Sequence, residues 1–259
     1  MDGLLILAVE TATSCGSVSL STGGLNNFRL LTECIAQPEI THSRRLLGSV
    51  KWVMRSAGVS WGDIDGIGVS IGPGSFTGLR IGLAAAKAMA MATGKPLLGV
   101  PTLEALALAC SGVNDGRLVG VILDARKKEV YAGFYRLDAQ KGPVQEGDPV
   151  VVPPGEVLGK IHEPVVLVGP GVTAYPEIFT GHEHIAIFPG FLASPRAAYV
   201  GLLAGRMLKD GICMDPASAA PLYVRASEAE LSLKKKKQAA SSQALDGSGH
   251  HGVTPKVNG

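Results

Sequence analysis

Short apolar runs and helical stretches follow one another in the same order in both halves of this chain. The first half has strand-like runs at 4–9, 17–21 and 28–35, then a helix at 42–57, a strand at 66–71, a helix at 76–93, a strand at 97–100 and a helix at 102–110. The second half has strands at 118–123, 129–137 and 149–152, then helices and strands at 154–161, 165–168, 175–179 and 195–208. Thr41, Thr102 and Ser194 stand at the starts of three of these helices and are their expected N-caps. The repeated order of elements predicts a duplicated α/β fold with a mixed sheet in each half.

Composition divides the chain into three parts. We expect subdomains at 1–111 and 112–225, followed by a disordered tail at 226–259 that is rich in Ala, Ser, Gly and Lys. The net charge is +2, but a run of four lysines at 234–237 lies in the tail, and the acidic and basic residues of the body balance. A neutral body has no general attraction for nucleic acid, so work on RNA would need another component to hold it.

Several features favour a cytoplasmic protein without membrane contact. No apolar run is long enough to span a bilayer, and the first residues lack the basic segment of a secretory signal. The four cysteines are scattered, with no Cys-x-x-Cys pair, which is typical of reduced thiols.

The sharpest local motif is GPGSFTG at 72–78, between a predicted strand and a predicted helix. Glycines allow a tight turn there, and the free N–H groups of a helix start attract anions. A strand-to-helix turn needs glycine without any ligand as well, so the motif alone leaves both interpretations open. The helix that follows carries Gly78, Gly82, Ala86 and Ala90 at four-residue steps, which permits the close approach of another backbone.

Further blocks follow in order around that motif. They are ILAVETAT at 6–13, CGSVSL at 15–20, HS at 42–43, GPGSFTGLRIG at 72–82, GVPTLE at 99–104, DAR at 124–126 and PLYVR at 221–225. Together they resemble the TsaB family, also called YeaZ, over residues 4–225. The resemblance implies an actin-like fold and a dimerisation subunit for the synthesis of tRNA threonylcarbamoyladenosine at position 37. It also implies TsaD as the catalytic partner, TsaE as an ATPase that joins them, and contact with tRNA only through the complex. A homodimer of the chain alone is compatible with the resemblance.

The resemblance leaves a choice between catalyst and partner. In the catalytic relative TsaD, two histidines four residues apart hold a metal at the start of the helix after the strand at 97–100, and one helical turn brings both to one ion. The matching positions here are Thr102 and Leu106, which cannot replace imidazole. His182 and His184 are two apart and would point to opposite sides of a strand. We expect no catalytic residue, no metal and no cofactor.

Two other groups of residues admit more than one interpretation. Asp124, Arg126 and Glu129 form a turn without glycine, where nucleotide-binding members of the fold have a glycine-rich turn, and they are either a salt-bridged turn or a catalytic cluster. Glu10 could hold a magnesium-bound water, but a lone carboxylate is a weak signal. An actin-like kinase or transferase that acts alone and a metallopeptidase are therefore the alternatives to a non-catalytic subunit.

We predict that the partner surface lies on the helices at 42–57 and 76–93. The first has a broader apolar arc than one sheet-facing stripe needs, and the second carries the small residues and adaptable methionines. The alternative is that both helices only cover the sheet. The predicted interface residues are Leu46, Leu47, Val50, Val53, Met54, Gly78, Gly82, Ala86, Met89 and Ala90.

Overall fold

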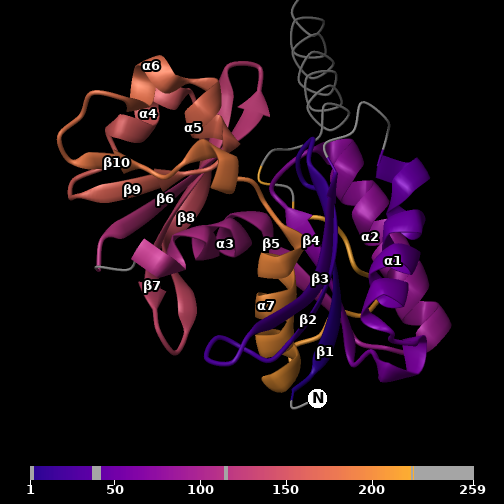
Figure 1. The fold of residues 1–259 in the computed structure, drawn as a ribbon. Coiled ribbons are helices and arrows are strands. Elements are labelled where there is room, and N and C mark those ends of the chain that lie inside the picture. Colours follow the sequence, from indigo (N-terminus) through magenta and orange to yellow (C-terminus); the bar gives the residue numbers. More distant parts are fainter. Residues whose placement is uncertain (1–2, 37–41, 114–115, 223, 225–259) are drawn as a thin grey trace, which may run out of the picture. The chain divides into compact units, whose positions relative to one another are not determined.

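The computed structural model describes residues 3–36, 42–113, 116–222 and 224, and within them the chain forms two five-stranded sheets (Figure 1). The first has the order β3-β2-β1-β4-β5 and the second the order β10-β9-β6-β7-β8. The first sheet consists of β1 (Leu5–Glu10), β2 (Gly16–Thr22), β3 (Arg29–Ala36), β4 (Gly66–Gly72) and β5 (Leu97–Pro101). The second consists of β6 (Leu118–Arg126), β7 (Glu129–Asp138), β8 (Gly142–Val152), β9 (Val165–Val168) and β10 (Ile185–Ile187).

The two sheets have the same topology. In each, the first three strands pair antiparallel in sequence order, and the fourth and fifth join on the other side of the first strand in parallel. Their strand orders therefore superimpose when β6 takes the place of β1. This confirms the predicted duplicated actin-like fold with two mixed sheets.

Helices cover both faces of the first sheet. Strand β1 alternates its side chains, so Leu5, Leu7 and Val9 face one layer, and Ile6 and Ala8 face the other. The first layer is α1 (His42–Ala57) and α2 (Phe76–Thr93), and the second contains α3 (Thr102–Ala107) and α7 (Ala197–Lys209). Figure 1 shows α1 and α2 on the opposite side of this sheet from α7.

The second sheet is also packed on both faces. Helix α3, which belongs to the first half of the sequence, covers one face and packs against β6 and β7. The other face is covered by α4 (Pro154–Leu158), α5 (Pro170–Ala174) and α6 (Pro176–Phe179). Because α7 from the second half lies on the first sheet, each half of the sequence contributes a helix to the other half's core.

Several predicted elements need correction. Strand β8 begins at Gly142 rather than at 149, since its first half is exposed and lacks an apolar pattern but is paired with β7. Strand β10 and helix α5 were not predicted, because both are short and the Gly-Pro-Gly sequence before α5 indicated only a turn. The predicted helix at 102–110 ends as α3 at Ala107 and continues as a 3₁₀ segment, Leu108–Val113.

Helix caps were also misassigned. The N-cap of α7 is Arg196 rather than the predicted Ser194, and the first backbone N–H of this helix donates 2.8 Å to Oγ of Ser17 on β2. A side chain from a distant strand therefore accepts the hydrogen bond that a neighbouring N-cap residue was expected to accept. The N-cap of α3 is Pro101 rather than Thr102, and the predicted cap Thr41 lies outside the described residues.

The described residues up to Val224 belong to one compact unit. We keep the boundary between subdomains at residues 111 and 112 as a proposal, because each side of it carries one complete sheet. The predicted tail at 226–259 lies outside the described residues. Within the described part of the chain, no helix combines the length and hydrophobicity that crossing a membrane requires.

Candidate functional site

Almost all of the predicted interface residues on α1 and α2 are buried. On α1, Leu46, Val50, Val53 and Met54 are at most 7% exposed and pack on the first sheet. On α2, the buried residues are Gly78, Gly82, Ala86, Met89 and Ala90. Leu47 is the exception, with an exposed fraction of 58%. Leu46, Leu47 and Met89 line a groove between the two helices, whereas the other predicted residues face the sheet or the interior. That a partner binds these helices stays a prediction.

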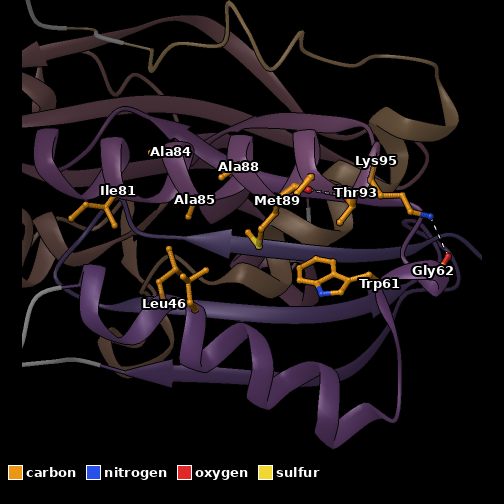
Figure 2. Close-up of a pocket in the computed structure, with 12 residues that line it drawn as sticks. Leu46, Trp61, Gly62, Ile81, Ala84, Ala85, Ala88, Met89, Thr93 and Lys95 are labelled. Atoms are coloured by element: carbon orange, nitrogen blue, oxygen red, sulfur yellow. Dashed lines mark hydrogen bonds between the residues drawn. The ribbon is translucent and has the colours of Figure 1, made fainter.

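An apolar groove of about 1010 Å³ runs between α1 and α2. Figure 2 shows the side chains that line it, with Leu46 on one side and a row of alanines from α2 on the other. The indole of Trp61, from the 3₁₀ segment Trp61–Asp63, closes one end, and there Lys95 Nζ donates 3.1 Å to the carbonyl oxygen of Gly62. The lining residues are Leu46, Leu47, Trp61, Gly62, Ile81, Ala84, Ala85, Ala88, Met89, Ala92, Thr93 and Lys95.

The motif at 72–78 lies at the start of α2, and the turn that follows β1 packs against it. The N–H of Ser75 donates 2.6 Å to the carbonyl oxygen of Ala12, and Thr11 Oγ1 donates 2.8 Å to the carbonyl oxygen of Gly78. A Cβ at Gly78 would overlap the carbonyl oxygen of Thr11, and one at Gly74 would overlap that of Ala12. Ser75 caps α2 through its Oγ, which accepts from Gly78 N–H. These glycines therefore serve close packing within the chain.

Glu10 ends β1 directly before that turn and is completely buried. Its Oε1 accepts a hydrogen bond from Ala12 N–H, and Oε2 has no partner among the described residues. Desolvation raises the pKa of Glu10 to about 7, against the weaker opposing effect of hydrogen bonds from Ala12 and Ser70. Within the described residues, no group of three or more His, Cys, Asp or Glu side chains is placed to bind a metal.

The two positions that match the metal ligands of TsaD lie in apolar surroundings. Thr102 and Leu106 are both 0% exposed, and Leu106 packs in the core between α3 and the second sheet. The hydroxyl of Thr102 has no hydrogen-bond partner in the described part of the chain. Neither side chain can act as a metal ligand of the imidazole type.

The turn at 124–129 is a tight hairpin rather than a cluster around a cavity. Asp124 Oδ1 accepts 2.8 Å from Arg126 N–H, and Arg126 and Glu129 are paired across the hairpin. Desolvation first, and the charge of the Asp124 carboxylate second, raise the pKa of Tyr175. Asp124 thus fixes the local backbone.

The two histidines near β10 are placed differently from the prediction. His182 and His184 precede the strand, so they do not point to opposite sides of it. Their ring centroids are 6.2 Å apart, and Nε2 of His182 lies 3.1 Å from the carbonyl oxygen of Ile178. A turn after α6 therefore accounts for the position of His182.

Comparison with known proteins identifies the family. A family model described as "TsaD: tRNA N6-adenosine threonylcarbamoyltransferase" matches residues 36–233. The chain is 31% identical over 226 residues to the tRNA threonylcarbamoyladenosine biosynthesis protein TsaB of Escherichia coli, covering 85% of this chain and 94% of that protein. The chain belongs to the TsaB (YeaZ) family, within the wider family of that model.

Other members of the TsaB family agree in sequence and structure. The TsaB protein of Bacillus subtilis is 28% identical, over 88% of this chain and 96% of its own length. The solved structure titled "YeaZ from Pseudomonas aeruginosa" is 29% identical with a TM-score of 0.70, over 85% of this chain and 99% of that chain. A second Pseudomonas aeruginosa structure, described as similar to peptidase YEAZ, reaches a TM-score of 0.74 at 29% identity, over 86% and 100% of the two chains. The family is thus one of tRNA threonylcarbamoyladenosine biosynthesis.

Proposed function

We propose that this chain is the non-catalytic subunit that activates TsaD by pairing with it through the groove between α1 and α2. TsaE joins this pair, tRNA is reached only through the assembly, and two copies of the chain pair through the same face when TsaD is absent. The observation that carries the proposal is the exposed apolar groove on these two helices. Family membership supports TsaD as its occupant.

The groove has the chemistry of a helix-binding face. Its centre is a row of alanines on α2, at positions 84, 85, 88 and 92, so the backbone of a partner helix can approach closely. Leu47 and Trp61 rise at the side and the end of the row, with exposed fractions of 58% and 38%. Large apolar side chains around a smooth floor are typical of the buried centre of an interface, and a stable interface covers about 800 Å² on each partner.

The residues at the TsaD metal positions support a partner role over a catalytic one. Threonine and leucine at 102 and 106 offer no imidazole nitrogen, and their side chains are enclosed by the protein core. The match to the TsaD model concerns the shared fold and leaves the catalytic role to be decided by these residues.

The test places a carboxylate on the floor or wall of the groove. Ala88 and Leu47 are exposed on α2 and α1, so Ala88→Glu and Leu47→Glu should fold like the wild type. Val50 and Ala86, two of the predicted interface residues, are 2% and 0% exposed, and a glutamate there would test the core instead. The matched control is Ala139→Glu, at the exposed tip of the β7–β8 hairpin.

We expect both groove variants to lose TsaD binding in calorimetry and to abolish tRNA modification in a reaction reconstituted from purified subunits. A charge left unpaired in an interface costs several kcal/mol, enough to weaken binding more than a hundredfold. The control should bind and support modification like the wild type. Unchanged TsaD affinity in both groove variants would show that the partner binds elsewhere.

A further inference from the structure

The tip of the β6–β7 hairpin carries three consecutive basic residues in a left-handed backbone conformation. The strand register shifts between Asp124 and Arg126, after which Arg126 and Glu129 are paired, and Lys127 and Lys128 form the two-residue loop between them. Their φ angles are 60° for Arg126, 54° for Lys127 and 61° for Lys128. A two-residue loop with positive φ at both positions matches the twist of the strands, and it normally contains Asn-Gly or Gly-Gly.

The use of lysine at this tip is exceptional within the chain. At eleven other described positions with positive φ the residue is glycine, and these three are the non-glycine residues with positive φ among the described ones. A side chain with a Cβ destabilises the left-handed conformation because the Cβ approaches the backbone carbonyl oxygen. Glycine at the tip would therefore be more stable, and strain of this kind points to a function that needs the side chains.

The three side chains are exposed and all cationic. Asp124 accepts from Arg126 N–H and so holds the turn in place, and Glu129, which is paired with Arg126, follows the two lysines at the start of β7. Because the acidic and basic residues of the body balance, this group of cations is a local feature and not part of a general positive field. Lysine and arginine side chains in such a position are suited to bind the phosphate groups of a nucleic acid.

We propose that the hairpin tip, residues 126–128, contacts the phosphodiester backbone of the tRNA substrate. This inference rests on the proposed function, in which the chain meets tRNA as part of the assembly with TsaD. The contact would hold and orient the RNA without reading its sequence, as phosphate contacts do. A tight turn fixes the backbone that carries the cations, so less backbone freedom is lost on binding than for cations on a flexible segment.

The test replaces the two loop lysines by the pair that this turn prefers. The double variant Lys127→Asn, Lys128→Gly removes two charges and relieves the strain at these two positions. The matched control is Lys160→Asn, Lys209→Asn, which removes two charges from exposed positions of the same half of the chain. Each full-length variant is assembled with TsaD, and tRNA binding is measured by fluorescence anisotropy over a series of salt concentrations.

We expect the hairpin variant to melt about 2–4 °C above the wild type and yet to bind tRNA about tenfold more weakly at low salt. The slope of log Kd against log salt should decrease by about 1–2, since each lost phosphate contact contributes about 0.7–0.9. TsaD affinity should be unchanged. A variant that is merely damaged would melt lower and would not combine higher stability with weaker RNA binding.

Three results would overturn the proposal: a tRNA affinity within twofold of the wild type, an equal loss in the control, or a lower melting temperature in the hairpin variant. Failure of the proposed function is a separate result, because the wild-type chain would then not bind TsaD. In that case the same salt series on the isolated full-length chain and its variants decides whether the tip binds RNA.

Discussion

Glu33 on β3 and Arg196 at the start of α7 form a largely buried ion pair that binds the second half of the chain to the first sheet. Oε2 of Glu33 accepts from Arg196 Nε at 3.1 Å and also from its terminal nitrogen. Oε1 accepts 3.0 Å from Ala198 N–H, in the first turn of α7. A carboxylate at the positive end of the helix dipole therefore satisfies both the cation and a helix N–H that lacks a partner within the helix.

Glu33→Gln should destabilise the protein, because the side chain of Glu33 is only 4% exposed and a neutral amide leaves the guanidinium without its counter-charge. We expect the free energy of unfolding in urea to fall by about 2–3 kcal/mol. The control is Glu163→Gln, which breaks the exposed pair with Arg136 and should leave stability unchanged. Equal effects in the two variants would show that Glu33 does not anchor α7.

Glu10→Gln should remove part of the pH dependence of stability. Burial raises the pKa of Glu10 from 4.5 to about 7, so between these values the folded protein keeps a proton that the unfolded chain has lost. The stability from this group is fully present below pH 4.5 and is lost as the pH rises through 7, a loss of about 3 kcal/mol.

The measurement for Glu10 is the free energy of unfolding of wild type and variant between pH 4.5 and 7. The difference between them isolates this group from the others that titrate in the same range. Wild-type stability should fall more steeply with pH than that of the variant. Parallel curves would mean that the carboxyl group is ionised in the folded protein and has a partner there.

Gly78→Ala should strongly destabilise the protein, because the added methyl group would overlap the carbonyl oxygen of Thr11. We expect a loss of about 2–3 kcal/mol in urea unfolding, as for overpacked cores. Gly155 on α4 has open space where a Cβ would lie, so Gly155→Ala should be neutral or slightly stabilising. A tolerated Gly78→Ala would show that the turn at Thr11 can move away from α2.

Local patterns predicted the long elements well. Helix α2 was predicted with its observed bounds, because a long stretch of small and apolar residues ends at Gly94, which has the left-handed conformation of a helix stop. Strands buried on both faces, such as β1 and β9, were recognisable as short apolar runs. Strands β8 and β10 were misjudged, since exposed or very short strands depend on their neighbours for stability.

The candidate site could be predicted only to the level of the helices. Helical spacing groups Leu46 and Leu47 on one arc, but it does not show which edge of that arc faces the sheet. In the structure, the exposed fraction is 6% for Leu46 and 58% for Leu47. The ion pair between Glu33 and Arg196 joins residues 163 positions apart, so no local pattern contains it. The strain at Lys127 and Lys128 likewise follows from the two-residue loop, which becomes visible only with the hairpin register.

Thr102→Val tests whether the position that matches a TsaD metal ligand is now part of the core. The hydroxyl is fully buried and has no partner among the described residues, so its burial costs free energy that an isosteric methyl group avoids. We expect the free energy of unfolding to stay equal or to rise by about 1 kcal/mol, and tRNA modification with TsaD to proceed at the wild-type rate. A clear loss of activity at wild-type stability would instead give this hydroxyl a role in the reaction, and the non-catalytic assignment would fall with that result.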